Sequence, residues 1–278
     1  MTETTSANTS AAASALPVLD IRNLTKQFGG LRAVGDFNLV VQKGALDGLI
    51  GPNGAGKTTA FNMISGLYVP TSGDIFLNGE NTVGMEPYEI TNLGVGRTFQ
   101  NIRLFPELTV LDNVMIAYHP HAGYSLADSL LRTRRFEVKE REMVDRAQEF
   151  LAIFGLERLQ NEVAKNLPYG EQRRVEIARA LASDPKLLLL DEPAAGMNPN
   201  EIGRLMEYIN FVHERFHLTI LLIEHQMRLV MNICQNLTVM DFGQVIARGT
   251  PKEIQDNPQV IEAYLGRGAA AKVGVLQK

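Results

Sequence analysis

The stretch that decides the fold is Gly51-Pro52-Asn53-Gly54-Ala55-Gly56-Lys57-Thr58. It follows the apolar run Leu46–Ile50, which predicts a short β-strand, and it leads into Thr58–Ser65, which predicts a helix. Glycines between a strand and a helix let backbone N–H groups converge on phosphate oxygens, and the helix N-terminus adds partial positive charge. The segment therefore predicts a phosphate-binding loop (P-loop) in an α/β protein.

The side chains of this loop indicate the kind of phosphate. A lysine at position 57 can reach the β- and γ-phosphates of a nucleoside triphosphate, and the Thr58 hydroxyl can bind Mg²⁺. We therefore expect ATP as the ligand. The residues expected to hold it are Asn53, Gly54, Ala55, Gly56, Lys57, Thr58 and Thr59.

Two adjacent carboxylates follow another apolar run. Asp191 and Glu192 come directly after Leu187–Leu190, which predicts a buried strand. Ligands of open parallel sheets bind beyond the carboxyl ends of the strands. We therefore expect Asp191 to bind Mg²⁺, directly or through water, and Glu192 to polarise the attacking water.

Two more polar residues are candidates for the same site. His225 follows the run Leu218–Ile223, where it can hydrogen-bond the γ-phosphate or the attacking water. The amide of Gln100 can bind Mg²⁺, although its spacing is equally compatible with an ordinary loop glutamine. The catalytic candidates are thus Lys57, Gln100, Glu192 and His225, and the metal-binding candidates are Thr58, Gln100 and Asp191.

A second glycine-containing segment, Leu167-Pro168-Tyr169-Gly170-Glu171-Gln172, precedes a predicted helix at Arg173–Ala182. A glycine at a helix start offers another anion site. A chain with one P-loop does not need a second such site for its own nucleotide. We therefore expect Tyr169, Gly170, Glu171 and Gln172 to bind the nucleotide of another chain across a dimer interface.

Strand and helix patterns alternate everywhere except in the middle of the chain. Further strands are predicted at Val18–Asn23, Phe37–Val41, Gly73–Leu77, Leu237–Met240 and Gln244–Ala247. Between Thr109 and Ser183 the patterns are helical, as in Val138–Phe154. We predict one domain over residues 16–266. Its parts are a core lobe (16–100 and 186–250), an inserted helical lobe (about 101–185) and C-terminal helices (251–266).

Composition narrows the class of protein. The 278 residues carry a net charge of −4, which gives no basic excess for nucleic acid. No run approaches the roughly 20 apolar residues that span a bilayer. The one cysteine, Cys234, is expected to be buried. We predict a soluble intracellular protein that reaches a membrane only through a partner, with a disordered tail at 1–15 and a flexible one at 267–278.

These segments, in this order, resemble the nucleotide-binding subunits of ABC transporters over about residues 17–266. The matching motifs are Walker A (Gly51–Thr58), the Q-loop (Gln100), the signature (Leu167–Gln172), Walker B (Leu187–Asp191, then Glu192) and the switch histidine (His225). The resemblance implies an ABC-type P-loop NTPase with a mixed-sheet core and an inserted α-helical subdomain.

The resemblance also implies how such a chain works. Two subunits sandwich two ATP molecules, each between one chain's Walker A and the other chain's signature. Phe28 falls where the family stacks an aromatic ring on adenine. The helical lobe and the Q-loop form a groove for a coupling helix of a membrane permease. ATP hydrolysis then powers transport.

Finer features are similar to the ATP-binding subunits of branched-chain amino acid importers (LivG-like). The matching stretches are Gly94–Phe105, Glu192–Pro199 and Ile261–Gly266, together with the insertion Ser125–Arg146. That branch implies a peripheral subunit on the cytoplasmic face of the inner membrane. Its partners are a second ABC ATPase, in a homo- or heterodimer, transmembrane permease subunits and, indirectly, a periplasmic solute-binding protein.

Other transport systems share this chemistry. Lipopolysaccharide export, amide or urea uptake and a soluble ABC ATPase without transport remain alternatives at this point. Two positions depart from the general pattern: Pro168 stands where the signature has serine, and Asn198 where the D-loop ends in aspartate. Both departures weaken the contact that this chain offers to a partner's ATP, which leaves open whether the two ATP sites of a dimer are equivalent.

Overall fold

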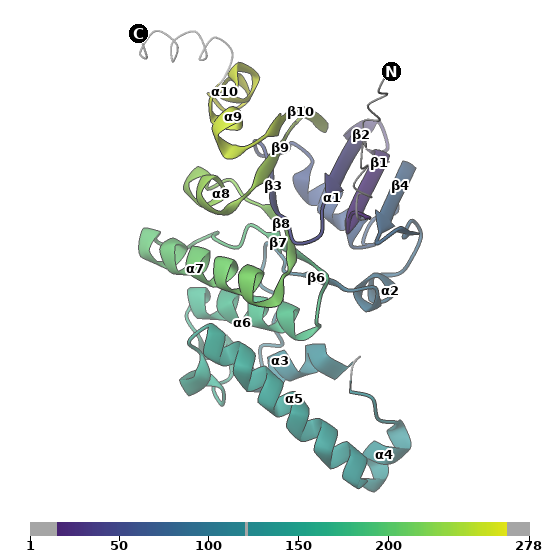
Figure 1. The fold of residues 1–278 in the computed structure, drawn as a ribbon, viewed down its shortest axis with the longest axis vertical. Coiled ribbons are helices and arrows are strands. Elements are labelled where there is room, and N and C mark those ends of the chain that lie inside the picture. The colour runs from purple at the N-terminus through teal and green to yellow at the C-terminus, as the bar shows by residue number, and fades with distance from the viewer. Residues whose placement is uncertain (1–15, 120–121, 266–278) are drawn as a thin grey trace, which may run out of the picture.

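The computed structural model describes residues 16–119 and 122–265. The tails predicted at 1–15 and 267–278 lie outside these residues. The central sheet has six strands in the order β10-β9-β3-β8-β7-β6 (Figure 1). Their bounds are β3 Leu46–Ile50, β6 Val95–Arg97, β7 Leu187–Asp191, β8 Thr219–Ile223, β9 Asn236–Asp241 and β10 Gln244–Gly249.

The apolar runs of the sequence form the middle of this sheet. Strands β7, β8, β3 and β9 are parallel neighbours, as predicted, and every residue of β3, β7 and β8 is buried. Only β10 runs antiparallel, beside β9, so the predicted mixed sheet is confirmed. Strand β6, which the sequence did not reveal, adds a parallel edge next to β7. It has three residues and contains Gly96, so it lacks the pattern of a strand.

A second, antiparallel sheet has the order β2-β1-β4-β5. Its strands are β1 Leu19–Phe28, β2 Leu31–Val41, β4 Ser72–Leu77 and β5 Glu80–Asn81. The first two are much longer than predicted, because Asn23 and Asp36 take positive φ angles at irregularities inside the strands. Such polar residues look like strand ends in a sequence but mark bulges here. The second sheet brings Phe28 to the rim of the phosphate-binding loop.

The helices that accompany the sheets are α1 Lys57–Ile64, α2 Pro87–Asn92, α7 Pro199–Phe216, α8 Met227–Ile233, α9 Pro251–Gln255 and α10 Pro258–Leu265. Helix α1 follows β3 after the glycine loop, as predicted. Cys234, which ends α8, is buried as expected. Among the described residues, no helix has both the length and the apolar content needed to cross a bilayer.

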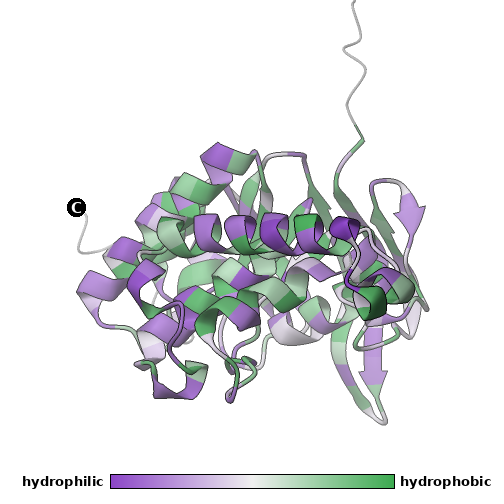
Figure 2. Cartoon of the chain, turned by 90° about the horizontal axis from the view of Figure 1, so that it is seen from below, coloured by the Kyte–Doolittle hydropathy of each residue, from purple (hydrophilic) through white to green (hydrophobic). Residues whose placement is uncertain are grey.

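Four further helices form a layer at one end of the molecule (Figure 1). They are α3 Val110–Tyr118, α4 Leu126–Leu131, α5 Arg134–Ile153 and α6 Tyr169–Ala182. Thr109 caps α3, because its side chain accepts a hydrogen bond from the Asp112 N–H. Hydrophilic and hydrophobic residues are interleaved along these helices (Figure 2). On α5 the buried positions are Met143, Ala147, Phe150 and Leu151, the face that the sequence pattern predicts.

The prediction that the signature helix begins at Arg173 is wrong. Helix α6 begins at Tyr169, directly after Pro168. The Pro168 carbonyl accepts hydrogen bonds from the N–H groups of Glu171 and Gln172, so the turn that contains Gly170 is already helical. Glycine disfavours a helix interior but is tolerated in the first turn, where capping governs.

Candidate nucleotide-binding site

The loop between β3 and α1 has the conformation that phosphate binding requires. Gly51 and Gly56 have φ angles of 149° and 98°. A Cβ on Gly51 would lie 2.1 Å from the Met240 carbonyl oxygen, and one on Gly56 would lie 2.5 Å from that of Ala33. Only glycine therefore fits at these two positions, and the loop wraps tightly over the start of α1.

Lys57 lies inside this loop. Its ammonium group donates hydrogen bonds to the carbonyl oxygens of Gly51 (2.8 Å) and Pro52 (3.0 Å). The residue is buried, and burial lowers the pKa of Lys57, while the nearby carboxylates, Glu192 foremost, act in the opposite direction. The charge is therefore held at the centre of the loop, where the predicted phosphates would lie.

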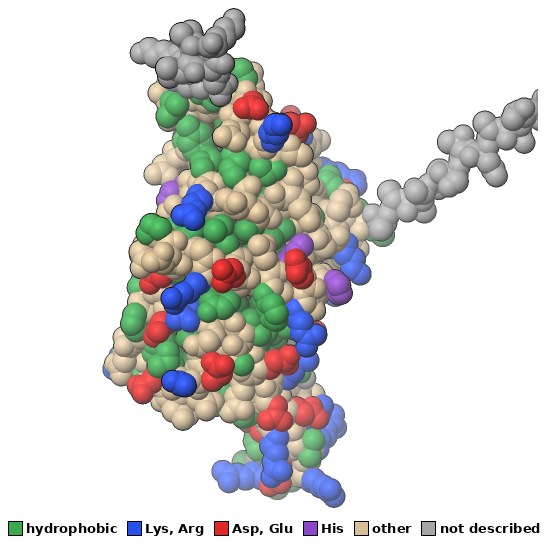
Figure 3. Space-filling view, turned by 60° about the vertical axis from the view of Figure 1, so that its left-hand side comes forward, with side chains coloured by type: hydrophobic (Ala, Val, Ile, Leu, Met, Phe, Trp, Pro, Cys, Tyr) green, Lys and Arg blue, Asp and Glu red, His purple; other side chains and the backbone are tan. Residues whose placement is uncertain are grey.

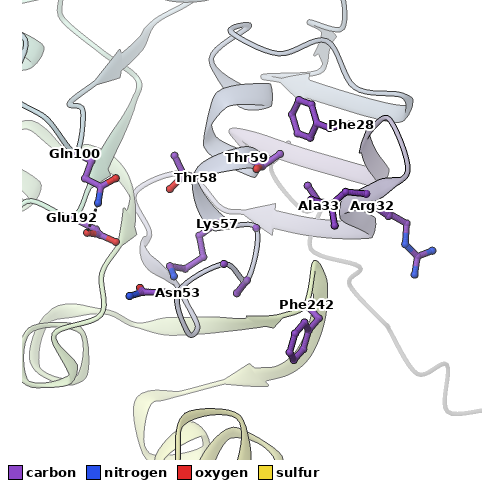
Figure 4. Close-up of a pocket in the computed structure, with 14 residues that line it drawn as sticks. Phe28, Arg32, Ala33, Asn53, Lys57, Thr58, Thr59, Gln100, Glu192 and Phe242 are labelled. Atoms are coloured by element: carbon purple, nitrogen blue, oxygen red, sulfur yellow. Dashed lines mark hydrogen bonds between the residues drawn. The ribbon is translucent and has the colours of Figure 1, made fainter.

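The loop forms one wall of a cavity of about 570 Å³ (Figure 4). Ten of the predicted site residues line it: Phe28, Asn53, Gly54, Ala55, Gly56, Lys57, Thr58, Thr59, Gln100 and Glu192. The lining also includes Phe242, in the turn between β9 and β10, which the sequence did not single out. The volume falls in the range of a small-molecule site.

Phe28 stands at the open end of this cavity. The residue is 42% exposed, and its ring meets that of Tyr68 edge-on, with the ring centroids 5.4 Å apart. The Lys26 ammonium lies 5.0 Å from the ring centroid. Tyr68 and Lys26 support the ring from its own side of the site, so Phe28 offers an exposed apolar surface to a ligand.

Asp191 ends β7 and is almost completely buried. Its Oδ2 accepts a hydrogen bond of 3.2 Å from the Arg97 guanidinium, and its backbone N–H donates to the Thr98 hydroxyl. Burial raises the pKa of Asp191, and Arg97 opposes that shift. The other carboxylate oxygen, Oδ1, is buried without a hydrogen-bond partner among the described residues. A buried oxygen without a partner is costly, so Asp191 is suited to bind a cation or water.

Thr58, Gln100 and Asp191 line a second cavity, of about 360 Å³, which shares Thr58 and Gln100 with the nucleotide cavity. A hydroxyl, an amide and a carboxylate are oxygen ligands of the kind that Mg²⁺ prefers. Among the described residues there is no group of three His, Cys, Asp or Glu side chains that could hold a metal. The three residues therefore fit Mg²⁺ as a partial ligand set, which phosphate oxygens and water would complete.

Glu192 lies between two of the predicted catalytic residues. Its Oε2 accepts a 3.1 Å hydrogen bond from the Gln100 amide and lies 3.6 Å from Nδ1 of His225. Glu192 itself has a φ of +46°, a left-handed conformation that costs a non-glycine residue about 1–3 kcal/mol. The structure thus brings Gln100, Glu192 and His225 together, although His225 is not part of the cavity lining.

Glu224 is a residue of this region that the sequence analysis missed. It is completely buried between β8 and His225, and its carboxylate accepts three backbone hydrogen bonds. The donors are the N–H groups of Ala194 (2.9 Å), His225 (2.9 Å) and Gln226 (3.0 Å). Ala194 belongs to the turn after Glu192, so Glu224 fastens the turn of Glu192 to the turn of His225. A carboxylate directly after an apolar strand was the available signal.

Comparison with known families identifies this arrangement. Residues 34–195, which include the P-loop, Gln100 and both carboxylates, match the family described as ABC transporter. The chain belongs to the ABC transporter family. Residues 244–270 match a second family, described as the branched-chain amino acid ATP-binding cassette transporter.

Individual relatives agree with this assignment. The high-affinity branched-chain amino acid transport ATP-binding protein BraF of Pseudomonas aeruginosa is 46% identical over 250 residues, which are 90% of this chain and 98% of that protein. The ADP-bound ATP-binding cassette MJ1267 superposes with a TM-score of 0.78 at 33% identity, covering 91% of this chain and 100% of that one. The dimeric cassette MJ0796, bound to ADP and phosphate, gives a TM-score of 0.73 at 26% identity, with coverages of 84% and 98%.

The signature of this ABC cassette lies away from its own P-loop. Pro168, Gly170 and Glu171 line a separate cavity of about 270 Å³, which has no residue in common with the nucleotide cavity. The Gln172 amide is used locally, donating to the Leu167 carbonyl. None of the signature residues Tyr169–Gln172 lines the nucleotide cavity, and their binding to another chain's nucleotide stays a prediction.

A buried ion pair links the signature helix to the Q-loop. The side chains of Arg173 and Glu176 are 0% exposed and pair at 2.7 Å. The Arg173 guanidinium also donates to the carbonyl oxygens of Phe99 and Gln100, and Glu176 accepts from the N–H groups of Phe99 and Arg103. We call this pair the Q-loop clamp. It fixes the backbone that carries Gln100.

Asn198, the departure in the D-loop, has a structural role within the chain. It caps α7 by accepting hydrogen bonds from the N–H groups of Asn200 (3.0 Å) and Glu201 (3.1 Å). The Glu201 carboxylate in turn accepts from the Asn198 N–H, which completes a capping box. Asparagine caps a helix about as well as aspartate, so this departure leaves the start of α7 intact.

Proposed function

We propose that this ABC ATPase powers the import of branched-chain amino acids through a membrane permease. The observation that carries the proposal is the second family match, over residues 244–270. The described part of this segment, residues 244–265, contains β10, α9 and α10, so it lies outside the P-loop, Walker B and signature. A match there cannot come from the ATPase motifs that all ABC cassettes share. It favours this branch over export systems.

The proposed roles in hydrolysis follow from the site. The loop amides and Lys57 hold the phosphates of ATP, and Phe28 stacks on the adenine ring. Thr58, Gln100 and Asp191 would hold Mg²⁺, which neutralises phosphate charge during hydrolysis. Glu192 takes the proton of the attacking water.

His225 and Gln100 position the groups around that water. Both lie close to Oε2 of Glu192, at 3.1 Å for the Gln100 amide and 3.6 Å for Nδ1 of His225. The Q-loop clamp holds the backbone of Gln100 to the signature helix. The position of Gln100 therefore depends on how the helical layer packs against the core. We propose that the layer formed by α3–α6 acts as the helical lobe and reports the state of the nucleotide through Gln100.

The second proposed element is a partner ATPase. The separation of the signature cavity from the nucleotide cavity supports a dimer, homo- or heteromeric, in which Tyr169, Gly170, Glu171 and Gln172 contact the partner's ATP. Pro168 offers no hydroxyl and no N–H at the start of α6. The contact that this chain offers to the partner's ATP is therefore weaker than that of a signature with serine, and in a heterodimer the two ATP sites differ.

The third proposed element is the permease. A groove of about 200 Å³ lies between α2, β6, α3 and α6, and its apolar lining includes Leu67, Pro87, Phe99 and Ala117. Phe99 precedes Gln100, so a permease helix seated in the groove would touch the Q-loop. The chain would then lie peripherally on the cytoplasmic face of the inner membrane and serve, through the permease, a periplasmic solute-binding protein. The net charge of −4 gives no support for a nucleic-acid partner.

Reconstitution tests the proposal. The chain is assembled in proteoliposomes with the permease subunits, the second ATPase and the solute-binding protein from the same source, and uptake of labelled leucine and of urea is measured with ATP. We expect ATP-dependent leucine uptake that the Lys57→Ala variant lacks. ATP turnover without leucine uptake, or a preference for urea, would refute the proposed cargo while leaving the ATPase assignment intact.

A further inference from the structure

The far end of the helical layer exposes three leucines. We call residues 123–136 the α4 tip. Leu126, Leu130 and Leu131 are 91%, 85% and 74% exposed, and helix α4 has no buried residue. Full burial of one leucine side chain is worth about 1.5–3 kcal/mol. Leaving three leucines of one short helix in water therefore forgoes a large stabilisation. Among the described residues, none buries these side chains.

The α4 tip presents these leucines on an ordered framework. Ser125 caps α4 in a capping box with Asp128, and Thr133 caps α5 and also donates to Asp128. Tyr124 meets Phe136 edge-on, with the ring centroids 5.0 Å apart. The two rings pack against each other, while the leucines of α4 remain exposed.

The tip is also basic. Arg132, Arg134 and Arg135 are exposed, and Asp128 is the sole acidic residue between positions 123 and 136. With three arginines and one aspartate the tip carries +2, whereas the whole chain carries −4. Figure 3 shows Lys and Arg side chains at the protruding lower end of the molecule, together with hydrophobic and acidic ones.

We propose that the α4 tip docks on the surface of an anionic phospholipid bilayer. Leucines can enter the boundary between headgroups and acyl chains while arginines pair with phosphate groups. The shape favours lipid over a protein groove, because the tip is convex and projects beyond the body of the fold (Figure 1). A bilayer accepts such a projection without a complementary cavity.

The position of the tip agrees with this assignment. Helix α3 contributes Ala117 to the groove proposed for the permease, and the chain continues from α3 to α4. In Figure 1, α2, beside that groove, and α4 lie on the same side of the fold. A cassette seated on its permease would carry the tip outward along that side, where lipid surrounds the permease. Docking on lipid itself requires neither ATP nor permease, so its test is separate from that of the proposed function.

Vesicle flotation of the full chain tests the proposal. Vesicles of phosphatidylcholine with phosphatidylglycerol are compared with vesicles of phosphatidylcholine alone, without nucleotide or permease. We expect flotation with the anionic vesicles only, weakened by salt. Replacing Arg132, Arg134 and Arg135 by glutamine should lower the partition coefficient by about a hundredfold.

A second triple variant, with Leu126, Leu130 and Leu131 changed to glutamine, should also lose flotation. The matched controls are Leu265→Gln and Arg215→Gln, two exposed positions outside the tip, which should float like the parent chain. All of these positions are exposed, so folding should be preserved, and an unchanged circular dichroism spectrum verifies it.

Three outcomes would overturn lipid docking. The first is equal flotation, or none, on both kinds of vesicle. The second is a leucine variant that still floats but no longer purifies with the permease, which would make the tip a protein contact. The third is a parent chain that self-associates through the tip, shown by a leucine variant of lower mass in sedimentation. The ATPase assignment survives each of these results.

Discussion

The Q-loop clamp offers a prediction whose size follows from burial. Arg173 and Glu176 are completely buried and paired at 2.7 Å. Removing one partner of a buried ion pair leaves the other charge without compensation, which costs about 3–5 kcal/mol. The loss of stability in Glu176→Gln should lie at the lower end of this range. The Arg173 guanidinium keeps its hydrogen-bond acceptors on Phe99, Gln100 and Tyr169 in that variant.

Arg173→Met adds a pH dependence. Burial already raises the pKa of Glu176, and Arg173 is the largest influence that opposes this shift. Without Arg173 the folded-state pKa rises further above its unfolded value, so the folded variant favours the protonated carboxyl. The stability that protonation of Glu176 provides is fully present below the pKa of the unfolded state, about 4.3. It is lost as the pH rises through the pKa of the folded state. The deficit relative to the parent should therefore grow with pH.

Urea denaturation of the parent, both single variants and Arg173→Met/Glu176→Gln measures these energies. The double variant removes both charges, so we expect its loss to be smaller than the sum of the single losses by about 2–3 kcal/mol. Single losses below about 1 kcal/mol, in the range of surface pairs, or strict additivity in the double variant would refute the reasoning that the pair acts as one buried unit.

Three further predictions concern the nucleotide sites. Phe28→Ala should weaken ATP binding by roughly 5- to 150-fold through lost stacking, with unchanged kcat; equal affinity in a fluorescence titration would count against stacking. Pro168→Ser should raise turnover at the partner's site, whereas Pro168→Ala, which restores only the N–H, should not; equal effects would discount the hydroxyl. Glu224→Gln places an amide NH₂ where backbone donors converge, which should cost about 1–3 kcal/mol of stability. It should also lower kcat with little change in KM, and an unaltered kcat would show that Glu224 does not position Glu192 and His225.

Much of the nucleotide site could be predicted from the sequence because its residues follow local patterns. The residues of the P-loop are contiguous in the sequence. Asp191 ends a strand that the run of leucines before it predicts to be buried. Because Asp191 ends one parallel strand of the sheet and Thr58 follows another, the two residues meet at the same edge and line one cavity. Local pattern also explains why helical structure was predicted at 138–154, where α5 lies.

What escaped prediction depends on tertiary contacts. Arg173 and Glu176 read as ordinary polar helix residues, and only the fold shows that both face the Q-loop. The role of Glu224 was missed because it depends on a contact that is distant in the sequence. One of its three donors is the N–H of Ala194, which follows a different strand. The short β6 was missed because its hydrogen bonds come from β7 rather than from its own sequence.

The measurement that tests the central claim most directly is ATP turnover by the Glu192→Gln variant within the assembled complex. Glutamine keeps the size of the side chain and its contact distance to Gln100 but cannot take a proton from water. We predict that turnover falls by about 10²–10⁴-fold, while ATP affinity stays unchanged and the ATP-bound dimer accumulates. Turnover near that of the parent chain would contradict the account, because another base would then have to activate the water.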